Sequence, residues 1–345
     1  MRIFKNVLVR ILASPGLDPL YRGLMRGRAT IFMLHRFADP ERGVEGNDPA
    51  ALRRSLAYLR RQRYQILDLE EMFQRLAGEG PPLDRAVAFT IDDGFLEQAT
   101  VACPVFAEFD CPVTTFVASG FLDGQLWPWW NQVEHIFEST PRTEVQILLG
   151  RDRLQYSLVD PGTWRAARED FTSRCKLVTD EEMRAAILRL AEAAEVHVPA
   201  RPPARYLPMS WDQLHECERH GMRFGPHTVT HPVLSRTSDD QSRREIEESW
   251  IRLRREAARP VPIFCYPNGN WEDFGTREMQ TLRELGLQGA VSGVPGYAEA
   301  GTFAMQPDER YKVRRFCYEA ELHYLAQSAC GLERLKGILQ GGRDA

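Results

Sequence analysis

The stretch that decides the fold is Ala86-Val-Ala-Phe-Thr-Ile-Asp-Asp-Gly94. A continuous run of apolar and β-branched residues is typical of a strand that is buried on both faces, as strands are in a parallel sheet. Functional groups of parallel barrels gather where such strands end. Asp92 and Asp93 stand at that point, so they are the first candidates for a functional site. Taken alone, they would equally suit a turn that only closes the strand.

Similar runs lie on both sides of this strand and alternate with helical patterns. The clearest helix start has Asp48 as N-cap and Pro49 at the first helical position. The predicted strands lie at 29–35, 112–118, 261–266, 288–292 and 311–316. This alternation predicts an α/β protein, a distorted parallel (β/α)7–8 barrel with its site at the carboxyl ends of the strands. No repeat of fixed period is present, which argues against a solenoid.

Residues 123–208 interrupt the alternation and predict an inserted helical segment or cap. They contain Trp127-Pro-Trp-Trp130, a helical run at 181–194 and a Pro-rich stretch at 201–205. The tryptophans suit either a hydrophobic core for the insertion or a platform on which a sugar ring stacks. The expected organisation is a basic N-terminal segment, a barrel that contains the insertion, and a C-terminal helix with a tail, at residues 1–28, 29–320 and 321–345.

Composition narrows the possible partners and surroundings. The chain has 44 basic and 48 acidic residues and a net charge of −4, which argues against nucleic acid as a partner. Its seven cysteines include no CxxC pair, so we expect neither a disulfide framework nor a zinc ribbon, and a reducing compartment is favoured. No apolar run reaches the ~18 residues of a membrane span. These features leave the oligomeric state open.

The basic segment 1–28 is a poor export signal because Arg10 interrupts its apolar stretch. We therefore expect a cytoplasmic protein. The segment suits an amphipathic helix packed on the barrel, or a weak contact with the inner face of the membrane.

A second polar cluster is His227-Thr-Val-Thr-His231. On a helical turn, histidines four residues apart lie on one face and can bind one cation. With one carboxylate they would form a two-histidine, one-carboxylate set, which suits zinc and also iron, cobalt or nickel. No glutamate follows His227, so the HExxH pattern of metalloproteases is absent. Two unrelated exposed histidines are the alternative.

A third cluster is Phe264-Cys-Tyr-Pro-Asn-Gly269, where Pro267 and Gly269 predict a tight turn after a strand. Such a turn can aim a backbone N–H at a developing oxyanion, or it can be purely structural.

Together the three clusters resemble the motifs of the polysaccharide deacetylases of the NodB-homology type. FTIDDGF (89–95), HTVTH (227–231) and FCYPNG (264–269) resemble the family's first three motifs, and GLQGAVSGVPG (286–296) resembles the segment that follows them. The resemblance covers about residues 30–320 and is poorest over 123–208. It implies a divalent metal, zinc first, held by Asp93, His227 and His231. It also implies that Asp92 is the catalytic base and that the N–H of Asn268 helps to hold the oxyanion.

Two departures from the family pattern concern the base and the acid. Many members have an arginine where this chain has Cys265, and Arg315 is the candidate replacement unless it is an ordinary surface arginine. Many members also have their catalytic acid, a histidine, at the end of the last strand. Here His323 lies in a helical pattern, whereas His35 ends the first apolar strand. First and last strands are neighbours in a closed barrel, so the chain resembles the circularly permuted, exopolysaccharide-associated members, with His35 as the acid.

The expected function is a metal-dependent hydrolase that removes N-acetyl groups from an amino-sugar polysaccharide or its precursor. Its expected partner is an N-acetylated glycan, and its products would be acetate and a free amino sugar. Two alternatives remain: an amide or formamide hydrolase of a small non-sugar substrate, and an inactive module that binds glycan.

Overall fold

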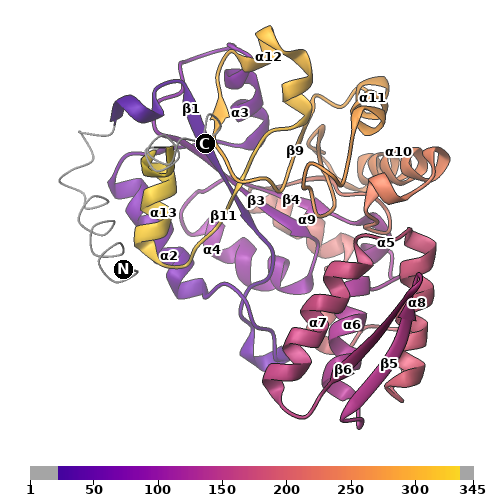
Figure 1. Cartoon of the computed structure of the whole chain (residues 1–345). Helices are drawn as coiled ribbons and strands as arrows, with labels where there is room; N and C mark the ends of the chain where they lie inside the picture. The colour runs from indigo at the N-terminus through magenta and orange to yellow at the C-terminus, as the bar shows by residue number, and fades with distance from the viewer. Residues whose placement is uncertain (1–21, 335–345) are drawn as a thin grey trace.

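The computed structural model describes residues 22–334 (Figure 1). Most of the predicted N-terminal segment 1–28 and the end of the predicted tail therefore lie outside the described residues. No helix in the described part is both long enough and apolar enough to cross a membrane.

A barrel of parallel strands forms the main body of the molecule. Strands β1, β3, β4 and β7 pair side by side in this order. β8 and β9 form a second parallel pair. Single bridges from Phe224 to Pro260 and from Val291 to Val313 connect this pair to the strands on either side. The bounds are β1 Arg28–Leu34, β3 Ala86–Asp93, β4 Val113–Val117, β7 Met222–Pro226, β8 Ile263–Cys265 and β9 Gly289–Val291.

The barrel closes where the end of the chain meets its beginning. Strand β11 (Phe316–Cys317) pairs in parallel with β1, with Phe32 opposite Phe316. The expected neighbourhood of the first and last strands is confirmed, and so is the barrel. Two short strands complete the sheet: β2 (Gln65–Ile66) pairs with β3, and β10 (Ala298–Glu299) pairs antiparallel with β1.

Helices surround the barrel in Figure 1, and side-chain caps begin several of them. Asp48 accepts hydrogen bonds from the N–H groups of Ala50 and Ala51, as expected for an N-cap, and Ser210 and Ser238 cap two later helices. The principal helices are α2 (Pro49–Arg61), α3 (Leu69–Leu76), α4 (Cys103–Ala107), α9 (Trp211–Arg219), α10 (Asp239–Glu256), α11 (Thr276–Glu284) and α13 (Leu322–Ala329). Short helices α5 (Ser119–Leu122) and α12 (Thr302–Met305) occur in loops.

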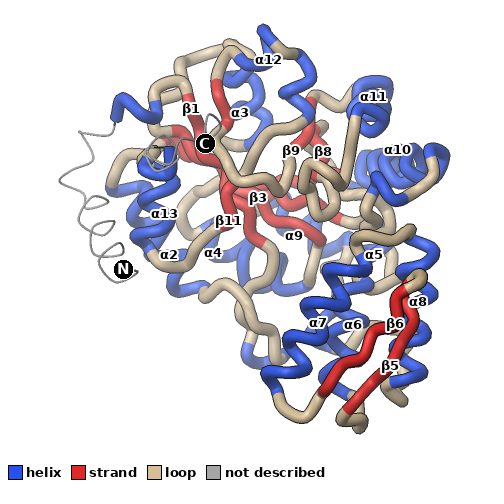
Figure 2. The backbone as a smooth tube through the Cα atoms, in the orientation of Figure 1, coloured by secondary structure: helices blue, strands red, loops and turns tan. Residues whose placement is uncertain are grey.

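The insertion forms a lobe with its own hydrophobic core, at the lower right of Figure 1. We call residues 129–198 the lobe. It consists of α6 (Trp129–Ser139), the antiparallel hairpin β5 (Glu144–Leu149) and β6 (Asp152–Ser157), α7 (Pro161–Cys175) and α8 (Asp180–Ala193). The hairpin was not expected in a helical insertion, although buried and exposed residues alternate along β5 as in a half-buried strand. Figure 2 shows this hairpin apart from the barrel strands.

The end of the chain also differs from the expected pattern. Instead of one strand over 311–316, a 3-10 helix (Pro307–Tyr311) comes first and only Phe316–Cys317 is strand. The final helix begins at Leu322, within the range 321–345 that was expected for the C-terminal helix and tail. Val313 still bridges to β9, so this irregular segment completes the barrel.

Candidate active site

The two aspartates at the end of β3 face different partners. Both are buried, with 3% and 4% of their surface exposed. Successive strand residues point to opposite sides, so Asp92 meets Arg315 and Asp93 meets the two histidines. Asp93 has a positive φ of 91° and Gly94 follows with 96°, so the chain turns away from the strand at this point. The DDG sequence thus forms a turn and places two neighbouring carboxylates against different partners.

Arg315 is the counter-charge of Asp92. Its Nη1 and Nη2 each donate a 2.8 Å hydrogen bond to one carboxylate oxygen, and its Nε donates to the carbonyl of Ser292. Arg315 is 1% exposed, so the alternative of a surface arginine is wrong. Burial alone would raise the pKa of Asp92, but the guanidinium outweighs burial and holds that pKa well below its usual value. Asp92 is therefore ionised and fixed in orientation.

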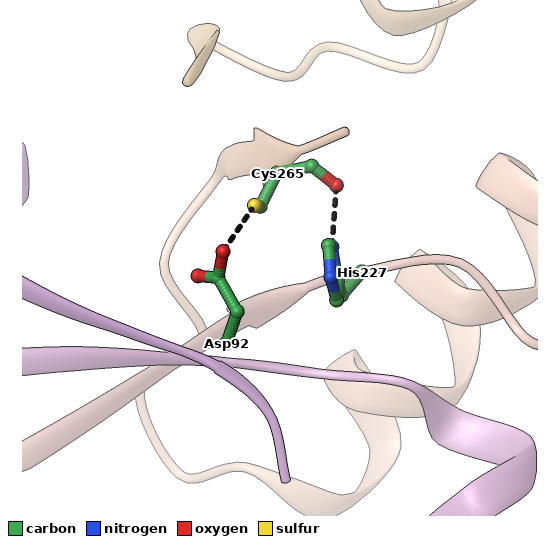
Figure 3. A group of neighbouring side chains, drawn as sticks. All are labelled: Asp92, His227 and Cys265. Carbon is green, nitrogen blue, oxygen red and sulfur yellow. Dashed lines mark hydrogen bonds between the residues drawn. The ribbon is translucent and has the colours of Figure 1, made fainter. Parts of the chain in front are cut away.

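Cys265 lies next to both Asp92 and His227 (Figure 3). Its thiol is 3.5 Å from Oδ2 of Asp92 and 3.2 Å from Nη2 of Arg315, and its backbone carbonyl accepts a 2.7 Å hydrogen bond from Nδ1 of His227. Burial raises the pKa of the thiol, so it stays neutral. A small neutral side chain at this position leaves room for the guanidinium that arrives from Arg315.

Asp93, His227 and His231 form a candidate metal group. Oδ1 of Asp93 lies 3.7 Å from Nε2 of His227 and 3.5 Å from Nε2 of His231. One ligand atom from each residue lies within 4.8 Å of the others. Because Nδ1 of His227 donates to a carbonyl, its Nε2 is the nitrogen left for a ligand. Burial and the charge of His227 lower the pKa of His231 to about 3, so this imidazole is neutral as a metal ligand must be.

These donors fit a divalent ion, because two imidazole nitrogens and one carboxylate are a common ligand set with open positions. A second group consists of Asp92, His227 and Cys265, and one potential ligand atom from each of them also lies within 4.8 Å of the others. It fits less well, since both oxygens of Asp92 already accept from Arg315 and the Cys265 thiol is neutral.

A loop, not the expected helical turn, brings the two histidines together. Thr228 and His231 have positive φ angles of 66° and 57°, which no α-helix contains. The β-branched residues between the histidines disfavour a helix. The buried carboxylate of Glu245 closes the loop instead: it accepts from the N–H groups of Val229 and Thr230, both at 2.8 Å, and from the hydroxyl of Thr230 at 2.6 Å.

Sequence reasoning missed Glu245. Helix α10 is rich in charge, and its sequence offers several other acids. Its position on the helix could have revealed it, because Glu245 lies on the face that also carries Ile246, Ser249 and Trp250, which are all buried. A carboxylate on the buried face of a helix requires partners, and here the metal-group loop supplies them.

His35 reaches the site from the end of β1, as expected for a candidate acid. Its Nε2 is 3.8 Å from Oδ2 of Asp92, and its side chain is 47% exposed. The rival His323 lies on α13, where its Nδ1 is 3.4 Å from Glu321. The structure thus brings His35, and not His323, to the two aspartates; its catalytic role stays a prediction.

Asn268 occupies the turn after β8 with a positive φ of 60°, followed by Gly269 with 77°. Its side-chain Nδ2 is buried without a hydrogen-bond partner. No hydrogen bond or ion pair within residues 22–334 joins Asn268 to the metal group. The tight turn is as expected, and the N–H role of Asn268 stays a prediction.

A cavity of about 420 Å³ opens over this group, between the barrel mouth and the lobe. His35 and Asp93 line it from the barrel, and α6 and α7 of the lobe line the other side. Trp130 lines the cavity and packs on His231 at 4.4 Å between ring centroids. Trp127 and Trp129 are buried in hydrophobic clusters, as the core interpretation of these tryptophans expected.

Comparisons with known proteins agree with this geometry. Residues 156–290 match the family model described as polysaccharide deacetylase, a range that includes both histidines of the metal group and Asn268 but not the paired aspartates. A search of curated proteins found no match.

Solved structures with similar folds come from several bacteria. The deacetylase PplD of Streptococcus pyogenes is 17% identical with a TM-score of 0.55, covering 89% of this chain and 97% of its own. IcaB of Ammonifex degensii is 15% identical with a TM-score of 0.55, covering 88% and 97%. A polysaccharide deacetylase of Bacillus cereus is 14% identical with a TM-score of 0.53, covering 88% and 69%.

Residues 156–290 are thus similar in sequence to the polysaccharide deacetylases, and the fold of the chain is similar to that of solved deacetylases.

Proposed function

We propose that the chain removes N-acetyl groups from an amino sugar within a glycan and that it requires a divalent metal, zinc first. The proposal rests on the different contacts that the two aspartates at the end of β3 make. Asp92 is locked by Arg315 beside the cavity, and Asp93 faces two imidazole nitrogens. Asp92 is therefore not one of the three candidate metal ligands, and its carboxylate is suited to act as a base.

An ion held by Asp93, His227 and His231 would polarise the amide carbonyl and lower the pKa of the attacking water. Asp92 accepts the proton of that water. The N–H of Asn268 donates to the oxygen on which negative charge develops. His35, at the exposed edge of the site, gives a proton to the departing amine. Acetate and the free amino sugar leave through the cavity.

The test is acetate release from N-acetylated oligosaccharides by the purified chain, with and without added divalent metal. We expect release that chelation abolishes and zinc restores. Asp92→Asn should keep the metal and lose about 10²–10⁴-fold in kcat, as removal of a general base does. Release of formate or acetate from small amides, with none from any glycan, would support the small-substrate alternative and contradict this proposal.

A further inference from the structure

Gln98 follows the two aspartates in the chain and is completely buried. It begins η4 (Gln98–Ala102), a π-helical turn that comes after the turn at Gly94 and leads into α4. The residue has 0% of its surface exposed. A buried amide must find its hydrogen-bond partners inside the protein, because water does not reach it. The partners of Gln98 therefore show which part of the molecule it serves.

The side-chain amide of Gln98 binds three backbone groups at the strand ends. Its Nε2 donates to the carbonyl of His35 at 2.8 Å and to the carbonyl of Asp92 at 2.6 Å. Its Oε1 accepts from the N–H of Gly94 at 3.0 Å. The amide can take only this orientation, because the flipped form would turn its oxygen toward two carbonyl oxygens and its NH2 group toward an N–H. Both the donor and the acceptor of Gln98 are thus used by the backbone around the candidate acid and base.

These hydrogen bonds extend the pairing of β1 and β3 by one step. The register of the two strands ends with Leu34 opposite Ile91, so the next pair would be His35 opposite Asp92. β1 ends at Leu34, and Gln98 binds the carbonyl of the next residue on each strand. A side chain from a third segment therefore joins the two residues that the proposed reaction uses as acid and base.

The residue before Gln98 holds the same stretch of chain. Glu97 is 2% exposed, and its carboxylate accepts a hydrogen bond from Nε of Arg36, whose guanidinium also packs over the ring of Phe95. Glu97 and Gln98 are consecutive, and so are the residues that they hold, His35 and Arg36. The chain that leaves β1 is therefore fixed by the segment that follows β3.

The candidate acid depends on this support more than the candidate base does. Arg315 holds the carboxylate of Asp92, and the backbone of Asp92 also pairs with Phe116 of β4. The side chain of His35 is 47% exposed, and its Nε2 is 3.8 Å from Oδ2 of Asp92, too far for a hydrogen bond. The place of this imidazole is therefore set by the backbone that carries it, and Gln98 holds that backbone.

We propose that Gln98 is a positioning residue that keeps His35 at a fixed distance from Asp92. The inference rests on the proposed function, in which these two residues are the acid and the base, and it adds a buried residue that does not line the cavity. Misplacing a reacting group by about 1 Å can cost about 10²-fold in rate. Loss of Gln98 should therefore slow the reaction through His35 and leave the metal group in place.

The first test is a double-mutant cycle. Gln98→Met keeps the approximate length of the side chain and removes its three hydrogen bonds. With an oligosaccharide of N-acetylglucosamine, the zinc-loaded variant should keep its zinc and its KM but lose about 10²-fold in kcat. In a His35→Ala background the same change should cost less than about threefold, because the acid that it displaces is already absent. An equal loss in both backgrounds would indicate a general structural role and would overturn the inference.

Gln327→Met is the matched control, because Gln327 is also a buried glutamine but lies on α13 and does not line the cavity. It should leave kcat unchanged, and a fall in kcat equal to that of Gln98→Met would contradict a specific role of Gln98. If Gln98→Met does not fold, Gln98→Glu takes its place in the cycle. Glutamate has the same shape and can accept from Gly94, but it donates at most one hydrogen bond, and only when it is protonated.

Crystal structures separate this inference from the proposed function. The zinc-loaded wild-type protein and Gln98→Met are compared for the distance between the backbone of His35 and Asp92. If no glycan releases acetate but this distance changes by about 1 Å or more in the variant, the positioning role stands and only the reaction fails. If acetate is released but His35 stays in place in the variant, the reaction stands and the role of Gln98 is overturned.

Discussion

At the scale of single residues, the site depends on one ion pair inside the barrel. Arg315 comes from the last barrel segment and holds both oxygens of Asp92, an aspartate of β3. Breaking a buried pair by removing one partner leaves a buried charge uncompensated, which commonly costs about 3–5 kcal/mol. We therefore expect the pair to contribute to stability and to the proposed catalysis.

Arg315→Met should lower the free energy of unfolding by about 3–5 kcal/mol at neutral pH, measured by denaturant titration. Without the guanidinium, burial dominates and the pKa of Asp92 rises. The acid limb of the kcat/KM profile should therefore move to higher pH, because the protonated aspartate cannot act as base. In an Arg315→Ala background, Cys265→Arg would again place an arginine beside Asp92. This second change should restore part of the free energy of unfolding and move the acid limb part of the way back. An unchanged acid limb in Arg315→Met would contradict the pairing.

Metal binding should release a proton from His227. Burial alone would lower the pKa of His227, but the Asp93 carboxylate and the carbonyl of Cys265, which accepts from Nδ1, raise that pKa well above its ordinary value, so the metal-free protein holds the proton at neutral pH. The ion must displace it, so the affinity should fall about tenfold for each unit that the pH drops below this pKa. Calorimetry in buffers of different protonation enthalpy should find about one proton released per zinc near pH 7. No release would show that His227 is neutral before the metal arrives.

At the scale of elements, the metal group depends on a loop that a neighbouring helix holds. The loop from Thr228 to His231 has two residues in the left-handed region, which is unfavourable for side chains with a Cβ. Glu245 on α10 offsets this by accepting three hydrogen bonds from Val229 and Thr230. The helix thus positions the loop that carries His231, a candidate metal ligand.

Glu245→Ala should weaken zinc binding by about 10–100-fold, as the loss of a residue that orients a metal ligand typically does. The measurement is competition against a chelator of known affinity, with the melting temperature recorded alongside. Glu248→Ala, a change at an exposed position of the same helix, is the matched control. Full zinc affinity in Glu245→Ala would show that the loop keeps its shape without the carboxylate.

The sequence could predict those features that depend on residues close together in the chain. The apolar run before Asp92 predicted the end of a strand, and the spacing of His227 and His231 predicted a pair of histidines that lie together. The partners of these residues lie far away in the chain: Arg315 is 223 residues from Asp92. Only the folded barrel shows that Arg315 is the arginine buried against Asp92. The helical interpretation of HTVTH was wrong for the same reason, because a distant glutamate stabilises the loop.

At the scale of the whole molecule, the strand order places the candidate acid. β1 lies between β11 and β3, so a histidine that ends the first strand reaches the site beside the last one. His35→Ala should retain the metal and lose about 10²-fold or more in kcat, since proton donation to the amine is removed. Activity on N-acetylated oligosaccharide and metal content are measured together.

The control for this prediction is His323→Ala, which should have little effect because His323 pairs with Glu321 on α13 and does not line the cavity. The reverse outcome, with His323 essential and His35 dispensable, would contradict the permuted arrangement of acid and base.

The position of Arg315 on the last barrel segment also has a consequence for the protein during its synthesis. The other candidate site residues, from His35 to Asn268, leave the ribosome before it does. Before Arg315 is synthesised, the position that buries Asp92 in the folded barrel provides no counter-charge. Strand β1 also cannot yet pair with β11. A nascent chain that stalls before Arg315 should therefore hold an open barrel and a protonated or solvated aspartate. We expect any hydrolytic activity of the chain to appear only after the last barrel segment has been translated.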